Sequence, residues 1–286
     1  MGCSLSVKVN PEHLRSIEAG TPPARCDNRA AVRKTLVDTA TSPMLVAVMR
    51  GRGRKTSAVR PLNAVDKYAL VIGIDDYLHW DMLDCPVRDA TVVGDWFQTH
   101  GFEVHTLLNK DATFANIVRA LMAVPTCGTA VVSLHGHGAK GATTSSFVPT
   151  NACTDPNDIS DKIPVALVQN WSLQWGGDRA LVIADCCFGG NFVLPPRIKM
   201  RGYRASQQER VRMTISASTM DEMVPDKQQG CSNSPLVHCV LRVLRSGNWN
   251  GSVLDLFVAV RRMSPEGCTP KMGRLPGDEG GDIWLK

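Results

Sequence analysis

The stretch TAVVSLHGHG, residues 129–138, is an apolar run that stops abruptly at histidines and glycines. Its small and β-branched residues predict a strand that is buried on both faces. A second run of this kind, ALVIADCCFGG at residues 180–190, ends in two cysteines instead. In open α/β sheets, chemically active side chains gather at the carboxyl ends of the strands. The two stretches therefore predict that a histidine and a cysteine meet at one edge of a sheet.

That pairing has a direct chemical meaning. The thiolate form of cysteine is the nucleophile, and a neighbouring base or cation makes it available near neutral pH. A cysteine beside a histidine at the end of buried strands is thus typical of a hydrolase that uses both. The function first indicated by the residues is a cysteine–histidine hydrolase.

Strand and helix patterns alternate along most of the chain. The expected strands are 68–74, 102–108, 129–134, 180–184, 212–217 and an edge strand at 281–285. The expected helices are 86–100, 111–124, 163–171, 234–244 and 252–263. Such alternation predicts an α/β fold, in which a mostly parallel sheet is flanked by helices on both faces.

Charge separates the chain into two parts. Residues 1–60 hold eleven Lys or Arg and four Asp or Glu, whereas the remainder holds 21 and 23. We expect residues 1–63 to be a basic tail of low order and residues 64–286 to be one folded domain. Since the basic excess lies in the tail and not in the body, nucleic acid is not an expected partner. On charge alone, the tail could equally be a solvated linker or a segment that faces an acidic surface.

The ten cysteines indicate the redox compartment of the protein. They show no C-x-x-C spacing, and no signal peptide precedes them, so reduced intracellular thiols are expected and a zinc ribbon is not. No apolar run reaches the roughly 18 residues that a spanning helix needs, so we expect no transmembrane segment.

The amino terminus predicts attachment to a membrane by lipid. The sequence MGCSLS fits the pattern for N-myristoylation of Gly2, and Cys3 is a suitable palmitoyl acceptor. One myristoyl chain anchors only marginally, and Cys3 and the basic run 50–55, RGRGRK, could strengthen it. We expect localisation at the cytoplasmic side of a membrane, or in the cytoplasm if the short pattern is a chance match.

With these residues placed, the chain resembles the caspase-like cysteine peptidases, and within them the metacaspases. The resemblance covers about residues 64–286 and rests on motifs that occur in family order. These are YALVIGIDDY at 68–77, Leu83 with Asp89-Ala90, Gly136-His137-Gly138, Asp185-Cys186-Cys187, and ISAS at 215–218 with Asp221-Glu222. The resemblance implies a caspase-like sandwich with a large-subunit-like part at 64–192, a linker at 193–210 and a small-subunit-like part at 211–286.

The resemblance also implies a role for each matching residue. Cys187 would be the nucleophile and His137 its acid–base partner, with the N–H groups of Gly138 and Cys187 as the oxyanion hole. Asp89 and Asp185 would hold an Arg or Lys side chain at the cleaved position of the substrate. His135 occupies a place where the family often has serine, and it could line the substrate pocket or be a hydrogen-bonded wall residue. Cys186 is expected to be a buried small hydrophobe.

Calcium is the one cofactor that the resemblance raises. Calcium-dependent metacaspases carry aspartates in the loop before the nucleophile and another shortly after it. Asp155, Asp158 and Asp161 lie in the first region, with Asp158 and Asp161 as weak metal candidates, but Leu194 stands where a later acid is expected. Such a site would be incomplete, since calcium takes six to eight oxygens. No cofactor is therefore required, and calcium stays open as an activator.

Two functions of different classes remain. The first is a membrane-anchored cysteine endopeptidase, which we expect to be a monomer acting on proteins or peptides with Arg or Lys at the cleaved position. The second is a catalytically weak pseudopeptidase that serves as a membrane-tethered binding or regulatory module. The retained Cys187 and His137 favour the first. An enzyme of this specificity could also cut itself within 195–212 or at 50–55.

Overall fold

The computed structural model describes residues 65–142, 144–175, 177–193, 210–228 and 230–286. The basic tail, the acylation pattern at Gly2 and Cys3, and most of the linker at 193–210 lie outside the described residues. The expectations for these segments therefore remain predictions.

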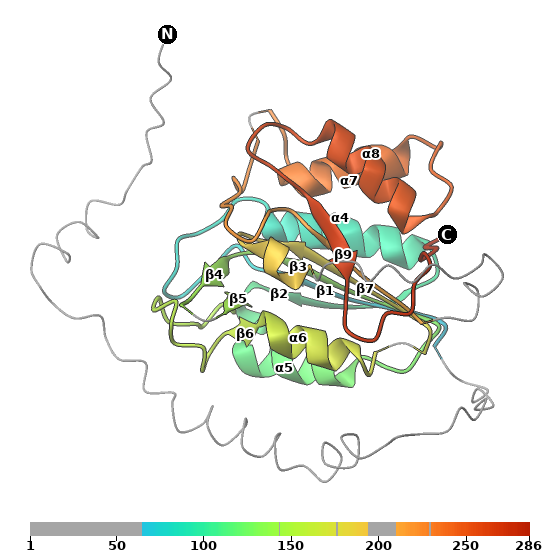
Figure 1. Cartoon of the computed structure of the whole chain (residues 1–286). Helices are drawn as coiled ribbons and strands as arrows, with labels where there is room; N and C mark the ends of the chain where they lie inside the picture. The colour runs from blue at the N-terminus through green and yellow to red at the C-terminus, as the bar shows by residue number, and fades with distance from the viewer. Residues whose placement is uncertain (1–64, 143, 176, 194–209, 229) are drawn as a thin grey trace, which may run out of the picture. The chain divides into compact units, whose positions relative to one another are not determined.

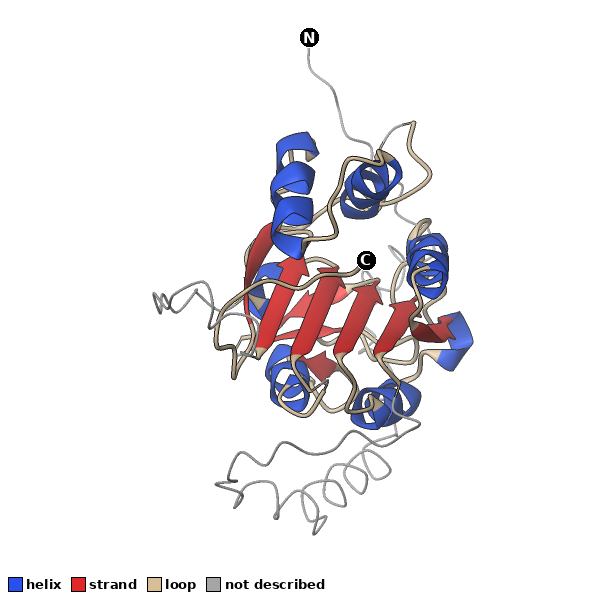
Figure 2. Ribbon diagram, turned by 90° about the vertical axis from the view of Figure 1, so that its right-hand side faces the viewer, coloured by secondary structure: helices blue, strands red, loops and turns tan. Residues whose placement is uncertain are grey.

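The described part of the chain is built on a six-stranded sheet. Its spatial order is β2 (Glu103–Leu108), β1 (Lys67–Gly73), β3 (Thr129–His135), β7 (Arg179–Asp185), β8 (Val211–Ser216) and β9 (Lys271–Arg274). All neighbouring strands are parallel except β8 and β9, and the twisted sheet is seen in Figure 2. The expected α/β class with a mostly parallel sheet is confirmed.

Helices cover both faces of this sheet. In Figure 1, α5 (Phe114–Ala123) and α6 (Val165–Ser172) lie below it, and α4 (Pro86–Thr99), α7 (Pro235–Arg245) and α8 (Val253–Met263) lie above it. Three of these helices begin at side-chain caps, in which Thr113, Ser234 and Ser252 accept hydrogen bonds from backbone N–H groups of the first turn. Within the described ranges, no helix combines the length and apolarity needed to span a bilayer.

The apolar core lies between the central strands and the upper helices. Val71, Val131 and Leu181 from the strands are completely buried and belong to one cluster with Leu236 and Val240 of α7. Full burial of each such side chain stabilises the fold by about 1.5–3 kcal/mol. This packing gives a rigid base to the loops that leave the sheet.

The strand register brings the important loops to one edge. Gly73 of β1 pairs with His135 of β3, and His135 in turn pairs with Asp185 of β7. Ala184 of β7 pairs with Ser216 of β8. Since the parallel strands end at the same level, the segments that follow β1, β3, β7 and β8 converge there. The ends of β3 and β7, which carry the histidines and the cysteines, therefore lie side by side, as residues 129–138 and 180–190 predict.

Two parts of the fold differ from the sequence expectation. A separate three-stranded sheet contains β4 (Gly138–Lys140), β5 (Ser145–Phe147) and β6 (Ile163–Pro164), none of which has enough residues for a visible pattern. The prediction of an edge strand at 281–285 was wrong. The strand beside β8 at the edge of the sheet is β9. Residues 281–285 instead lie beside the start of α8, where the N–H of Val253 donates to the carbonyl of Ile283 at 3.0 Å.

Candidate active site

Cys187 lies at a sharp turn directly after β7. Its side chain is half-buried, and its Sγ is 3.8 Å from the carbonyl oxygen of Val224. The next residue, Phe188, has a φ of 58°, a left-handed conformation that costs a non-glycine residue about 1–2 kcal/mol. The chain therefore holds a strained backbone where it turns away from the sheet, a feature that clusters at functional sites.

The two adjacent cysteines differ in their surroundings. Burial raises the pKa of the Cys187 thiol, and it raises the pKa of Cys186 well above the ordinary range. Cys186 is only 3% exposed, whereas Cys187 is half-buried. Because a thiol must lose its proton to react, the buried Cys186 is the less reactive of the two.

His137 follows β3 and is oriented from the opposite side by the segment after β1. Its backbone N–H donates to the hydroxyl of Tyr77 at 2.8 Å, and its Nε2–H donates to the carbonyl of Asp81 at 2.8 Å. The rings of Tyr77 and Trp80 lie 4.8 and 5.5 Å from the imidazole, measured between ring centroids. A proton on Nε2 leaves the lone pair of Nδ1 free to act as a base. Burial lowers the pKa of His137, so the imidazole is neutral at neutral pH.

Gly138 and Cys187 approach each other closely through their backbones. A β-carbon at position 138 would overlap the carbonyl group of Cys187 and lie 3.3 Å from its backbone nitrogen. Only glycine allows this approach. The structure thus brings together the two residues that the sequence assigns to an oxyanion hole.

A cavity of about 160 Å³ opens beside Cys187 and His137. It is lined by Leu83, Pro86, Asp89, Gly136, His137, Asp185, Cys186, Cys187, Met223, Val224, Pro225, Asp226 and Ser234. Three carboxylates are in this lining, and among the described residues no lysine or arginine belongs to it. The cavity is therefore suited to a cation.

Asp89 and Asp185 come from different elements and are joined by Ser234. The hydroxyl of Ser234 donates to Asp185 Oδ2 at 2.7 Å, and its backbone N–H donates to Asp89 Oδ2 at 3.0 Å. Asn233 Nδ2 donates to Asp89 Oδ1 at 2.5 Å. The same serine begins α7 by accepting a hydrogen bond from the N–H of Val237 at 3.2 Å. The helix cap thereby fixes the position of both acids.

The pKa of Asp89 reflects its burial and the neighbouring carboxylate of Asp185. Burial, together with the neighbouring charge of Asp185, raises the pKa of Asp89 to about 6. Both carboxylates are in a partly desolvated place with no lysine or arginine in the described cavity lining, and their ionised forms repel each other, although the His135 imidazole partly offsets the effect of this repulsion on Asp89. A cation that enters the cavity would relieve this repulsion.

His135 lies behind the acids and is completely buried. Its Nδ1–H donates to Asp185 Oδ2 at 3.1 Å, and Ser133 Oγ lies 2.8 Å from its Nε2. Of the two interpretations left open by the sequence, this arrangement is that of a hydrogen-bonded wall residue. His135 orients Asp185 and is not part of the cavity lining.

The metal candidates in the loop before β6 are occupied by interactions within the protein. Asp161 accepts a hydrogen bond from the N–H of Cys153 at 2.7 Å and pairs with the completely buried Lys162 at 3.0 Å. Asp158 accepts from the hydroxyl of Ser160 at 2.6 Å, and its carbonyl accepts from Lys162 Nζ at 2.9 Å. An ammonium group thus stands among the oxygens that a metal would need. These residues do not fit calcium.

Sequence reasoning missed several residues that build the site. Asp226 was not singled out, yet it lines the cavity, and its Oδ2 accepts from the N–H of Asp84 at 2.5 Å. Burial raises its pKa. Tyr77 was quoted only as part of a motif and Ser234 only as a helix start, although a serine before Pro235 is a recognisable cap. Asp226 lies in a segment without periodicity, so nothing in the sequence indicates its place.

The chain is similar to known proteins in sequence and in fold. The family model described as caspase domain matches residues 66–271. No curated protein matches the chain significantly. A solved structure of a protein from Geobacter sulfurreducens is similar with a TM-score of 0.53 and 20% sequence identity. That match covers 72% of this chain and 92% of the other and indicates a shared fold alone.

Proposed function

Because the chain belongs to the caspase-domain family of peptidases, we propose that it is a cysteine endopeptidase that cleaves after Arg or Lys. The observation that carries this specificity is the cavity beside Cys187, which has three carboxylates in its lining and no lysine or arginine among its described residues. Family membership supports the reaction class, and the cavity supports the choice of substrate.

Acylation begins with a neutral thiol and a neutral imidazole. As Cys187 Sγ attacks the carbonyl carbon, its proton passes to Nδ1 of His137, and the carbonyl oxygen becomes an oxyanion. Hydrogen bonds from the backbone at Gly138 and Cys187 would stabilise that charge, by roughly 3 kcal/mol for each donor. The imidazolium then gives its proton to the leaving amine, the C–N bond breaks, and a thioester remains.

Deacylation uses the same two residues. A water molecule gives a proton to His137 and attacks the thioester carbonyl. Collapse of the second tetrahedral intermediate breaks the C–S bond, and the sulfur recovers a proton from the imidazolium. The carbonyl of Asp81 keeps the imidazole in one orientation through both steps.

Electrostatics decide which side chain enters the cavity. The planar guanidinium of arginine can hydrogen-bond to two carboxylates, and lysine can supply a point charge. An acidic side chain would meet Asp89, Asp185 and Asp226 and be excluded at a cost of several kcal/mol. We expect no cleavage after Asp.

The test uses fluorogenic peptides that carry Arg, Lys or Asp at the cleaved position. Wild type should release the fluorophore from the Arg and Lys peptides, Cys187→Ala should be inactive, and Cys186→Ala should retain much of the activity. Activity in Cys187→Ala, or preference for the Asp peptide, would overturn the proposal. An inactive but folded wild type would favour the pseudopeptidase instead.

Lipid anchoring forms a separate part of the proposal. It rests on the sequence of Gly2 and Cys3 and on the basic run 50–55. Gly2→Ala should move the protein from the membrane fraction to the supernatant, and Cys3→Ser should weaken attachment. Intact-mass measurement of protein from its native cell checks the acyl chains. A protein without acyl groups, found wholly in the supernatant, would contradict this part.

A further inference from the structure

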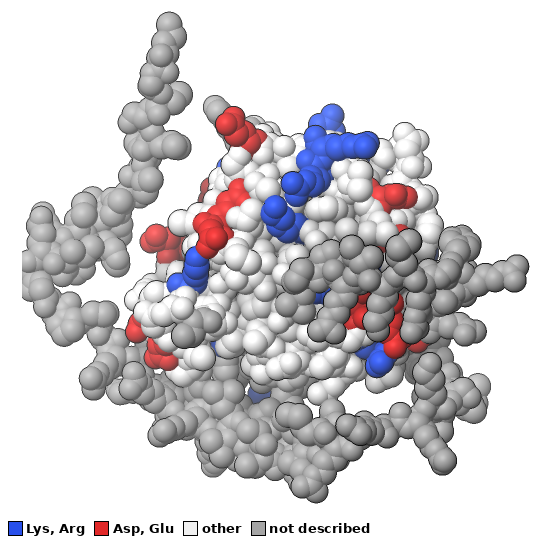
Figure 3. Space-filling model, in the orientation of Figure 1, with Lys and Arg blue, Asp and Glu red and all other residues white. Residues whose placement is uncertain are grey.

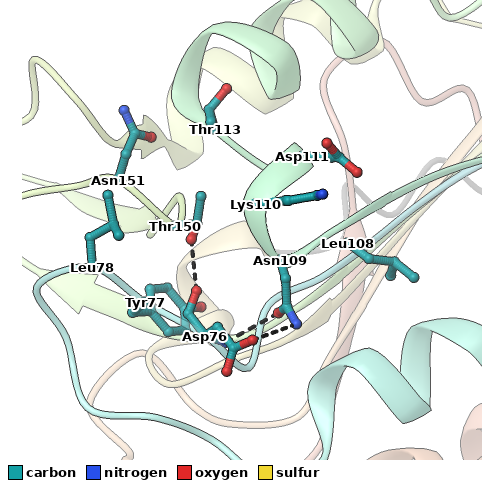
Figure 4. A pocket seen from close by; sticks show the side chains of 10 residues that line it. All are labelled: Asp76, Tyr77, Leu78, Leu108, Asn109, Lys110, Asp111, Thr113, Thr150 and Asn151. Atoms are coloured by element: carbon teal, nitrogen blue, oxygen red, sulfur yellow. Dashed lines mark hydrogen bonds between the residues drawn. The ribbon is translucent and has the colours of Figure 1, made fainter.

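A larger cavity, of about 550 Å³, lies at the carboxyl ends of β1 and β2. Its lining consists of Asp76, Tyr77, Leu78, Leu108, Asn109, Lys110, Asp111, Thr113, Thr150 and Asn151, and Figure 4 shows how these side chains surround it. Apart from Tyr77, which also contacts His137, none of them serves the catalytic arrangement described above.

The cavity is held in shape by polar contacts among its own residues. Asn109, at a left-handed φ of 43°, accepts hydrogen bonds from the N–H groups of Asp75 and Asp76 at 2.8 and 3.1 Å. Its Nδ2 donates to Asp76 Oδ2 at 3.0 Å, and Thr150 Oγ1 donates to the carbonyl of Asp76 at 2.7 Å (Figure 4). The carboxylate of Asp76 is thereby held in place by Asn109.

Tyr77 connects this cavity to the catalytic histidine. Its hydroxyl accepts the backbone N–H of His137, and its ring lies against the imidazole. The strand order β2-β1-β3-β7-β8 places β1 and β2 on one side of His137 and Cys187 on the other. Tyr77 lines this cavity and His137 lines the smaller one, so their contact connects the two.

The reaction indicates which part of the substrate lies near this cavity. His137 protonates the leaving amine, which belongs to the residue after the scissile bond, so the chain that follows must pass His137. Neighbouring strands are about 4.8 Å apart, so from a bond between the ends of β7 and β3 the ends of β1 and β2 lie roughly 7 and 12 Å away. An extended peptide advances about 3.3 Å per residue, so the second to fourth residues after the bond reach the cavity.

We propose that this cavity is the subsite for the second to fourth substrate residues after the scissile bond, and that it takes a long basic side chain. The inference rests on the proposed function and names its substrate class further. We call this cavity, with the ten lining residues given above, the leaving-side cavity.

Charge and shape support a basic occupant. Asp76, Asp111 and Lys110 are all exposed, and the two acids outnumber the one base in the lining. Leu78 is 71% exposed and, with Leu108, offers apolar surface for an aliphatic stem. Figure 3 shows several acidic side chains and fewer basic ones along the left of the described surface, with further acidic ones at the right.

The chain itself contains a sequence of the predicted kind. In RGRGRK at 50–55, a cut after Arg50 would put Arg52 and Arg54 at the second and fourth positions beyond the bond. Alternate residues of an extended chain point to the same side, so both arginines could face the cavity. This sequence is the basis of the probe.

The experiment compares two substrates on the full-length protein. One is a peptide with Arg at the cleaved position joined directly to a coumarin, which has no residues beyond the bond. The other is a quenched peptide with Arg at the cleaved position followed by Gly-Arg-Gly-Arg, with a Gly-Glu-Gly-Glu version for comparison. Wild type should prefer the Arg version by about fivefold or more in kcat/KM.

Variants of the leaving-side cavity should change only the longer substrates. Asp111→Lys should reduce kcat/KM for the Arg version by about fivefold, and Lys110→Glu should raise it. Both variants should cleave the coumarin substrate as wild type does. Asp95→Lys, at an exposed position of α4 outside both cavity linings, is the matched control and should change neither.

Three outcomes separate the possibilities. Cleavage of the coumarin substrate without any preference beyond the bond overturns this inference and leaves the proposed function intact. Equal effects of Asp111→Lys on both substrates would indicate a structural role and would also overturn it. If wild type cleaves no basic substrate, the proposed function fails and this inference fails with it.

Discussion

Two acidic regions of this molecule meet the same physical problem in different ways. Asp89 and Asp185 share a cavity that has no lysine or arginine in its described lining. Asp161, in the loop before β6, is paired with the ammonium of Lys162, which is completely buried. The first region has only the imidazole of His135 beside Asp185, whereas the second region contains the ammonium group of a lysine.

The role of a buried carboxylate depends on the charged groups beside it. A buried acid that is paired and hydrogen-bonded is part of the fold, because removal of its partner would leave an uncompensated charge. A buried acid without a cation carries an unfavourable energy, which a charged ligand can relieve. The comparison thus predicts binding in one region and structural support in the other.

The structural region also reaches the active site. Asp161 accepts the N–H of Cys153, whose carbonyl accepts Trp80 Nε1–H at 2.9 Å. Trp80 in turn lies against the ring of His137. The Lys162–Asp161 pair therefore supports His137, the proposed acid–base residue, through a continuous set of contacts.

The largest expected effect is the loss of substrate binding in the first region. Asp185→Asn preserves the shape of the side chain but removes its charge, which leaves the substrate cation poorly paired. We expect kcat/KM for the Arg-coumarin substrate to fall by about 100-fold or more, mainly through KM. Asp221→Asn, on an exposed acid that pairs with Lys140, is the control. Retention of activity in Asp185→Asn would mean that the pair does not bind the substrate.

Removal of the internal cation should destabilise the second region. Lys162→Met leaves Asp161 buried and unpaired, and the free energy of unfolding should fall by about 3–5 kcal/mol. Lys140→Met breaks an exposed pair and should change it by less than about 1 kcal/mol. Urea denaturation of both variants measures the difference. Similar values for the two would show that the buried pair is no stronger than the exposed one.

The acid pair should make stability depend on pH. The pKa of Asp89 is raised to about 6 in the folded protein, above its value in the unfolded chain, so the folded state binds the proton more tightly. Stability should therefore fall as the pH rises from about 4 to 6 and stay level above that. Asp89→Asn should remove this loss and gain roughly 3 kcal/mol relative to wild type by pH 7.

Urea denaturation of wild type and Asp89→Asn at pH 4, 5, 6 and 7 tests the sign. A wild type that gains stability relative to the variant as the pH rises would contradict the raised pKa. A ligand with a guanidinium group should reduce the difference at pH 7, because it supplies the missing charge.

The smallest expected effect is that of calcium. Since the ammonium of Lys162 stands among the oxygens of the loop, millimolar calcium or a chelator should shift the melting temperature by less than about 1 °C. Differential scanning calorimetry with calcium and with the chelator checks this. A clear loss of stability in chelator would show that a metal is held there despite Lys162.

Much of the framework follows from local pattern. The buried runs at 68–74, 129–134 and 180–184 predict the central strands, because residues that face a core on both sides must be apolar. Thr113, Ser234 and Ser252 predict helix starts through their hydroxyl groups. The short strands β4, β5 and β6 escaped detection because two or three residues carry no period, and β9 contains a charged residue at each end.

Local sequence pattern was enough to predict the class of fold, which the structure confirms, and its motifs predict Cys187 and His137 as the catalytic pair. The contacts of His135 with Asp185, of Ser234 with two acids distant in the chain, and of Lys162 with Asp161 became known from the folded chain alone. The reason is physical. Burial and periodicity are written into neighbouring residues, whereas the charge that a carboxylate faces depends on which distant side chains the fold places beside it.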